Sequence, residues 1–99
     1  MSERSESCRI DVWLWRARFC KTRSLAARIV ADGDVRLSRN GVEVKLGKPG
    51  HSVHRDDILR IALGARQISL RVEALGVRRG PAAEARALYS ALGEAVLVR

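Results

Sequence analysis

The chain has 99 residues, a length that suffices for one compact domain but not for two. Lys and Arg number 19 against 11 Asp and Glu, which gives a formal net charge of +8 and a sequence pI near 11.0. This surplus of positive charge favours a polyanionic partner, although small domains carry net charges of similar size for solubility alone. The positions of the charges must decide between the two interpretations.

The first ten residues, MSERSESCRI, are polar and charged and lack the apolar segment of a secretory signal. The two cysteines, Cys8 and Cys20, are expected to be free thiols in a reducing compartment. No apolar run approaches the ~18 to 20 residues that cross a bilayer. We therefore expect a cytoplasmic protein without a membrane partner.

The first third of the chain predicts two short helices joined by a tight turn. Residues 1–8 are polar and are expected to be disordered, whereas residues 10–19 carry apolar side chains at helical spacing. Thr22 is the expected N-cap of a second helix, which Gly33 ends. The predicted core positions of the two helices are Ile10, Trp13, Leu14, Ala17, Leu25, Ala26, Ile29 and Val30.

The rest of the chain predicts strands and one further helix. Apolar and polar side chains alternate over residues 35–37 and 42–44, on either side of Asn40-Gly41. This dipeptide is typical of the turns of two-residue β-hairpins. After an expected loop from Lys45 to Gly50, two more strands are predicted within residues 56–63 and 67–75. Pro81 predicts a helix that extends to about Leu92, and the apolar tail from Ala95 to Val98 is expected to seal the core.

Positive charge is concentrated in the predicted helix-turn-helix. Five basic residues and no acidic residue occur from Arg16 to Arg28. Lys21 and Arg23 flank a helix N-terminus, where cations are unfavourable by ~0.3 to 1 kcal/mol, so function explains their position better than stability does. Free N–H groups at this terminus, together with the hydroxyls of Thr22 and Ser24, suit a phosphate. The alternative is a solvated basic face with an ordinary threonine cap.

Further basic residues extend the predicted surface. Arg36 and Arg39 lie beside the hairpin turn, and Lys45 and Lys48 lie in the expected loop. Asp56 and Asp57 are expected to mark an opposite, less basic side. Arg78 and Arg79 are interpreted either as a second contact with the polyanionic partner or as a charged loop, and these alternatives stay open.

Several of these residues carry a family resemblance. The elements R-I-D-x-x-L from Arg9, R-F-x-x-T-R-S-x-A from Arg18, and G-x-V-R-L from Gly33 resemble the S4 RNA-binding domain. The D-x-W-L-W element at Asp11 and R-R-G-P-A at Arg78 narrow the resemblance to the fifteen-kilodalton ribosome-associated heat-shock protein family. It implies an α+β fold of the S4 type (alpha-L motif), in which two helices pack on a small, mostly antiparallel sheet with a C-terminal strand-helix extension. The expected organisation is a disordered N-terminus over 1–8, the S4-like domain over 9–63, and an extension over 64–99 packed on it.

The resemblance also implies a function. Members of this family bind structured ribosomal RNA on free large ribosomal subunits that carry peptidyl-tRNA, and they rescue or recycle these subunits after heat stress without catalysing a reaction. Such contacts read the shape of a folded RNA through phosphates and 2′-hydroxyls. From the family motif and from the charge placement, the expected RNA-binding residues are Arg9, Arg16, Arg18, Lys21, Thr22, Arg23, Ser24, Arg28, Arg36, Arg39 and Lys45.

Three positions depart from the family pattern. Val12 stands where many relatives carry Lys, which removes one expected phosphate contact. Asp56 occupies a turn position that normally takes Gly. Asn40-Gly41 lies slightly later than the usual hairpin turn, so the sequence leaves the register of that hairpin open.

Other functions find less support in the sequence. No zinc-site spacing is formed by the cysteines and histidines Cys8, Cys20, His51 and His54, so no metal is expected. The sequence also contains no recognisable catalytic pattern or phosphate-binding loop. We therefore expect no cofactor, no small-molecule substrate and no enzymatic activity. A monomer is expected. Three rivals remain: a dimeric DNA-binding regulator that places the second helix in a major groove, a protein adaptor that meets an acidic partner, and another small ribosome quality-control factor.

Overall fold

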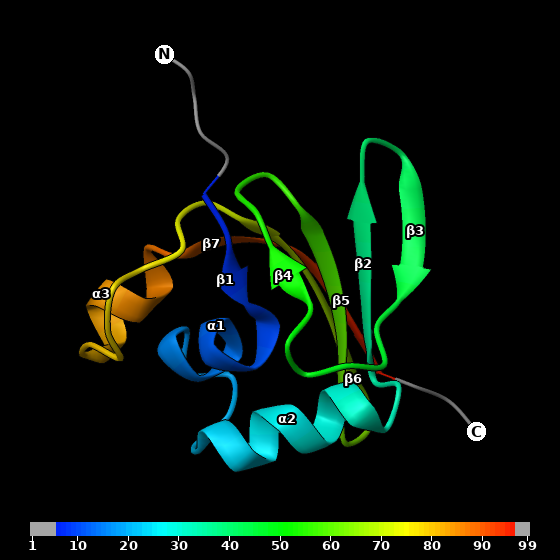
Figure 1. Ribbon diagram of the computed structural model, residues 1–99, viewed down its shortest axis with the longest axis horizontal. Helices are drawn as coiled ribbons and strands as arrows, with labels where there is room; N and C mark the ends of the chain where they lie inside the picture. Colours follow the sequence, from blue (N-terminus) through cyan, green and yellow to red (C-terminus); the bar gives the residue numbers. More distant parts are fainter. Residues whose placement is uncertain (1–5, 97–99) are drawn as a thin grey trace.

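The computed structural model describes residues 6–96, although not the side chains of Ala95 and Val96 (Figure 1). A five-stranded antiparallel sheet, in the order β3-β2-β5-β6-β7, forms its centre, and a two-stranded pair, β1-β4, lies beside it. The helices gather on one side of the sheet in Figure 1, which confirms the expected α+β class. In chain order the elements are β1 (Cys8–Arg9), α1 (Ile10–Arg16), α2 (Arg23–Ala31), β2 (Val35–Arg39), β3 (Val42–Lys45), β4 (Ser52–Val53), β5 (Ile58–Leu63), β6 (Arg66–Val72), α3 (Ala82–Arg86) and β7 (Tyr89–Val96).

The helix α1 ends at Arg16 and not at Phe19 as predicted. Arg18 adopts a left-handed backbone (φ 65°), which a right-handed helix cannot continue. The amide N–H groups of Phe19 and Cys20 donate to the carbonyl of Leu14 and close the turn. This turn directs the Phe19 ring between those of Trp13 and Tyr89, with centroid separations of 6.2 and 4.8 Å.

The helix α2 begins and ends where the sequence predicts. The side-chain oxygen of Thr22 accepts a hydrogen bond from the Leu25 amide at 3.0 Å, and Gly33 follows the helix with φ 83°. Ala26 and Val30 are buried, but Leu25 is 43% exposed, so its placement in the core was wrong. Leu25 lies in the first turn of α2, on the solvent side of the helix.

The hairpin between β2 and β3 confirms the interpretation of Asn40-Gly41. Both residues have positive φ, 54° and 82°, as a two-residue type I′ turn requires. Arg39 pairs with Val42 across the turn, which fixes the register that the sequence left open. Lys45 belongs to β3 and not to the expected loop, since it pairs with Arg36 of β2.

The chain ends differently from the sequence prediction. Helix α3 stops at Arg86, and residues up to Val96 form β7 along the free edge of β6, so the predicted helix to Leu92 was wrong. Alanines favour a helix locally, whereas pairing along β6 satisfies backbone groups on a whole sheet edge. Ala95 and Val96 therefore extend the sheet, and the remainder of the apolar tail lies outside the described residues.

The start of the chain also needs correction. Cys8 and Arg9 form β1, paired with Val53 and Ser52 of β4, so the expected disorder does not extend to residue 8. Residues 1–5 lie outside the described part of the chain.

One core joins α1, α2, β2, β4, β5 and β6, whereas β3 is exposed along its whole length. Trp13 is fully buried, as predicted, and its indole N–H donates to the Ala74 carbonyl at 2.9 Å. The inner sheet face contributes Val35, Leu37, Leu59, Ile61, Ile68 and Leu70. The alternate residues of these strands, including Arg36 and Arg60, therefore face away from the helices.

Candidate nucleic-acid interface

The arginines of this chain divide into partnered and unpartnered groups. Among residues 6–96, seven arginines form ion pairs with carboxylates: Arg9, Arg39, Arg55, Arg60, Arg66, Arg71 and Arg78. Three others donate to backbone carbonyls: Arg16, Arg18 and Arg79. Within residues 6–96, the basic side chains with neither kind of partner are Lys21, Arg23, Arg28, Arg36, Lys45, Lys48 and Arg86. Five of these seven were predicted to bind RNA.

Lys21, Arg23 and Arg28 follow α2 from its N-terminus to its last turn. All three side chains are exposed, and the first turn of α2 contains no acidic residue. The unpaired N–H groups at this end of the helix and the exposed hydroxyl of Ser24 add hydrogen-bond donors beside the cations. Thr22 caps the helix and lies at the same end. This part of the surface suits phosphate groups.

A second group of cations crosses the outer face of the sheet. Arg36 of β2 pairs with Lys45 of β3 on one side and with Arg60 of β5 on the other. Like charges at directly opposite positions destabilise a sheet, so this row favours a polyanionic ligand over a purely structural role. Arg60 contacts the carboxylate of Glu43 at 3.4 Å, which compensates part of its charge.

Arg60 was missed in the sequence. Its place between Leu59 and Ile61 does indicate an outward-facing strand position. Its alignment with Arg36, however, depends on pairing between strands far apart in the chain.

Lys45 of the sheet group reaches the segment that joins α2 to β2. A side chain added at Gly33 would have its Cβ 2.6 Å from Cε of Lys45, so Lys45 lies directly over this glycine. Figure 1 shows the chain turning from the end of α2 into the start of β2. Asp32 and Asp34 flank Gly33, but neither forms an ion pair with Lys45. We call Lys21, Arg23, Arg28, Arg36, Lys45 and Arg60 the basic surface.

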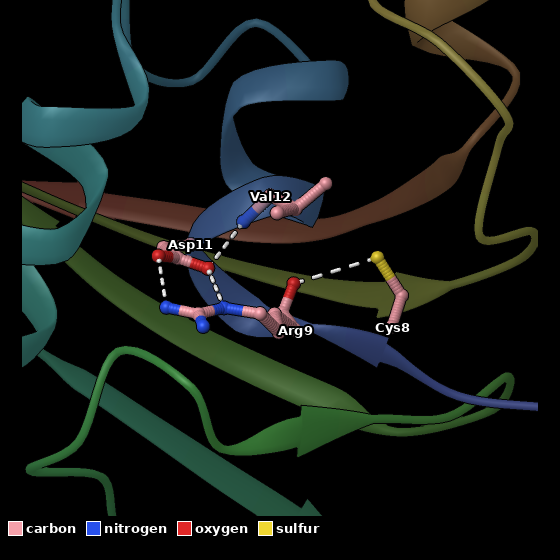
Figure 2. Close-up of polar contacts among 4 residues, drawn as sticks. All are labelled: Cys8, Arg9, Asp11 and Val12. Atoms are coloured by element: carbon pink, nitrogen blue, oxygen red, sulfur yellow. Dashed lines mark hydrogen bonds and ion pairs between the residues drawn. The ribbon is translucent and has the colours of Figure 1, made fainter.

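Arg9 is held by a neighbouring carboxylate (Figure 2). Its Nε and Nη2 donate to the two oxygens of the buried Asp11 at 3.0 and 2.9 Å, and Asp11 also accepts from the Val12 amide. The hydrogen bonds with Asp11 raise the pKa of Arg9. Arg9 therefore secures the start of α1, with a compensated charge.

Arg16 and Arg18 hold the segment that leads to α3. Nη1 of Arg16 donates to the carbonyls of Leu75 and Gly76 at 3.3 and 2.8 Å, and Nε of Arg18 donates to Gly80 at 2.7 Å. In return, Nε of Arg79 donates to the Trp15 carbonyl at 3.0 Å, and its guanidinium lies 6.0 Å from the centre of the Trp15 ring. A backbone carbonyl has no net charge and does not neutralise the cation that it binds. Arg16, Arg18 and Arg79 therefore secure the extension while keeping their positive charge.

Arg39 lies apart from the basic surface. Its guanidinium pairs with Asp57, which is only 2% exposed and also accepts from the His54 amide. Asp57 therefore lies beside Arg39 and does not mark an opposite side as expected. Asp56 has φ 74°, which agrees with a turn position that normally takes Gly.

The cysteines and histidines do not converge. No group of three or more potential metal ligands occurs in the described residues. Burial raises the pKa of both the Cys8 and the Cys20 thiol. No helix in the described part of the chain is long and apolar enough to cross a membrane.

Comparison with known proteins identifies the family. The S4 domain model matches residues 8–59, just over half of the chain. A trimeric structure of heat shock protein 15 from Vibrio cholerae superposes with a TM-score of 0.75 and 37% sequence identity, covering 87% of this chain and 82% of that one. The chain belongs to the heat shock protein 15 family of S4-domain proteins.

Sequences of other heat shock protein 15 family members support this family assignment. The Escherichia coli (strain K12) protein is 38% identical over 88 residues, which cover 89% of this chain and 62% of the relative. The Aeromonas salmonicida homologue is 36% identical, with 89% and 63% coverage. The chain thus spans somewhat less than two thirds of the length of these relatives. The predicted S4 fold is confirmed by the domain match and by the structural superposition.

Proposed function

We propose that this heat shock protein 15 homologue binds structured RNA through the basic surface and catalyses no reaction. The observation that carries the proposal is how the cations of residues 6–96 are partnered. Most arginines there contact carboxylates or backbone carbonyls, whereas five of the seven cations with neither kind of partner lie on or beside α2, β2 and β3. Phosphates that bind there meet exposed cations whose charge is uncompensated, so binding displaces few internal ion pairs. The row on the sheet and the N-terminus of α2 lie on different elements, which favours a folded RNA over a straight duplex.

The proposed target is ribosomal RNA of free large subunits that carry peptidyl-tRNA, with tRNA as a second contact, in the cytoplasm after heat stress. The support is the family membership and the resemblance of the Arg9–Arg36 motif. We propose that the chain acts as a monomer. Light scattering coupled to gel filtration tests this against the trimeric form of the Vibrio cholerae structure.

Sedimentation with ribosomal fractions from the source organism tests the proposal. We expect selective comigration with large subunits at moderate salt and reduced comigration of the Arg23→Glu and Arg28→Glu variants. Arg55→Glu is the matched control, because it makes the same charge change at an exposed arginine outside the basic surface. Equal loss in all three variants would indicate that net charge alone drives binding.

The rival functions predict other outcomes. A protein adaptor would still capture its partner after nuclease treatment, and a DNA-binding regulator would prefer duplex DNA to folded RNA in a direct competition. Either result would overturn the proposal.

A further inference from the structure

A pocket of about 210 Å³ lies between the turn after α1 and the C-terminal elements α3 and β7. Its walls include the rings of Phe19 and Tyr89 and the side chains of Ala82 and Ala85, and Arg18 and Arg86 stand around it. The volume is below the roughly 300 Å³ of sites for drug-sized ligands, so the pocket suits one planar group.

The chemistry of the pocket combines aromatic rings with uncompensated positive charge. The Phe19 and Tyr89 rings are tilted by 52° with centroids 4.8 Å apart, and both are only partly buried. Arg86 has no ion-pair or hydrogen-bond partner among residues 6–96, and Arg18 uses only its Nε, on the Gly80 carbonyl. An aromatic wall beside two cations matches a nucleobase joined to its phosphate.

The backbone at this pocket supports a functional role. Arg18 is one of only three non-glycine residues with positive φ in the described chain, and such strained positions concentrate at binding sites. Four residues further along the chain, Thr22 caps α2 at the start of the basic surface. These four residues span at most about 14 Å even when fully extended, so one RNA chain can contact both the pocket and the N-terminus of α2.

We infer that this pocket accepts a single unstacked base of a bound RNA, with Arg18 and Arg86 contacting the adjacent phosphates. The inference rests on the proposed function and adds a second kind of contact to it. The basic surface reads phosphates, whereas the pocket selects RNA that offers an unpaired nucleotide. Duplex RNA without loops or bulges, in which every base stays stacked, would leave the pocket empty.

Photocrosslinking tests the site directly. The full chain is irradiated with a short unstructured RNA that carries 5-iodouridine, whose photochemistry favours stacked aromatic side chains, and the crosslinked residue is identified by mass spectrometry. We expect crosslinks at Tyr89 or Phe19. Crosslinks confined to other residues would overturn the inference.

Two neighbouring alanines provide a matched pair of variants. Ala82→Leu places bulk in the pocket, whereas Ala83→Leu adds the same group to the same helix outside the pocket lining. We expect Ala82→Leu to abolish the crosslink and weaken binding of the unstructured RNA about tenfold, as loss of one stacked base does. Ala83→Leu should behave like the parent protein, and equal crosslinking by both variants would contradict the pocket.

Arg86→Gln is a second variant that does not depend on repacking, because Arg86 is exposed and has no partner in the described structure. It should weaken binding of unpaired RNA more than binding of a fully paired duplex, and equal effects on both would contradict the inference. Failure of the proposed function is distinguishable, since the parent protein would then bind neither RNA. Binding without crosslinks at the pocket rejects the pocket alone.

Discussion

The Arg39 guanidinium contacts both carboxylate oxygens of Asp57 across 18 positions of sequence, at 2.8 and 2.7 Å. This pair joins the end of β2 to the turn before β5, next to the hairpin tip. Asp57 is buried, and it also accepts the His54 amide at 2.7 Å. The hydrogen bonds with Asp57 raise the pKa of Arg39, as a persistent ion pair requires. Arg39 therefore stabilises the fold, and we expect it to contribute less to RNA binding than Arg36.

Replacing Asp57 should destabilise the protein. Asp57→Ala leaves the His54 amide without its acceptor and the Arg39 guanidinium with only the Ser52 carbonyl at 3.3 Å. Hydrogen bonds to charged groups contribute about 1.5 to 3 kcal/mol. We expect a loss of about 2 to 3 kcal/mol in the free energy of unfolding, measured by urea denaturation. The adjacent Asp56→Gly is the control, because Asp56 is exposed and its φ of 74° suits glycine. An equal loss in the two variants would contradict the role assigned to the pair.

The row of cations on the sheet should determine part of the salt dependence of RNA binding. Arg36→Ala removes one proposed phosphate contact, so the slope of log K against log salt should fall by about 1. Glu43→Gln should have the opposite effect on affinity, because it frees the guanidinium of Arg60 from its acidic partner. Fluorescence anisotropy over a salt series measures both.

Arg78→Ala is the control for this series, since Arg78 pairs with Glu84 outside the row. It should leave the slope nearly unchanged. A Glu43→Gln variant with weaker binding would exclude the sheet row from the interface.

Local signals in the sequence account for the elements that were predicted well. Thr22, Gly33 and Asn40-Gly41 each act on the few residues around them, through a side-chain cap or a positive φ that the residue type tolerates. Their effects need no knowledge of the rest of the fold. The extent of α2 and the position of the hairpin therefore followed from the sequence.

The errors arise from contacts between distant parts of the chain. β7 replaces the predicted helical residues after Arg86 because β6 offers an unpaired edge, which no local pattern around Tyr89 reveals. Arg60 joins Arg36 only through strand register. The charges of Arg9 and Arg39 look equivalent to those of Arg23 and Arg28 in the sequence, and only the fold shows that they are compensated by aspartates.

The cap of α2 should contribute to stability in a way that depends on its hydroxyl. Thr22→Ala removes the acceptor of the Leu25 amide, and losing such a cap costs about 1 kcal/mol. Thr22→Ser keeps the oxygen and should retain most of the stability. Urea denaturation followed by circular dichroism distinguishes them, and equal stability of the two variants would show that water replaces the cap.

The two thiols should react slowly in the folded protein. Burial raises the pKa of Cys8 and Cys20, so each forms less thiolate near neutral pH than an ordinary cysteine with a pKa of about 8.5. Cys20, only 2% exposed, should be the more protected against iodoacetamide. The Cys8→Ser and Cys20→Ser variants, each with one thiol, allow the rates to be compared in native buffer and in urea.

The raised pKa values of the two thiols also determine how the stability of the protein changes with pH. A thiol whose pKa is raised by folding stabilises the native state while it stays protonated, and this contribution disappears as the pH rises through the folded pKa. Stability should therefore decline above about pH 8.5. The Cys20→Ala variant lacks the buried thiol, so its stability should decline less at high pH. If its pH profile is unchanged, and if Cys20 in the native protein is alkylated as fast as in urea, then Cys20 is accessible to water.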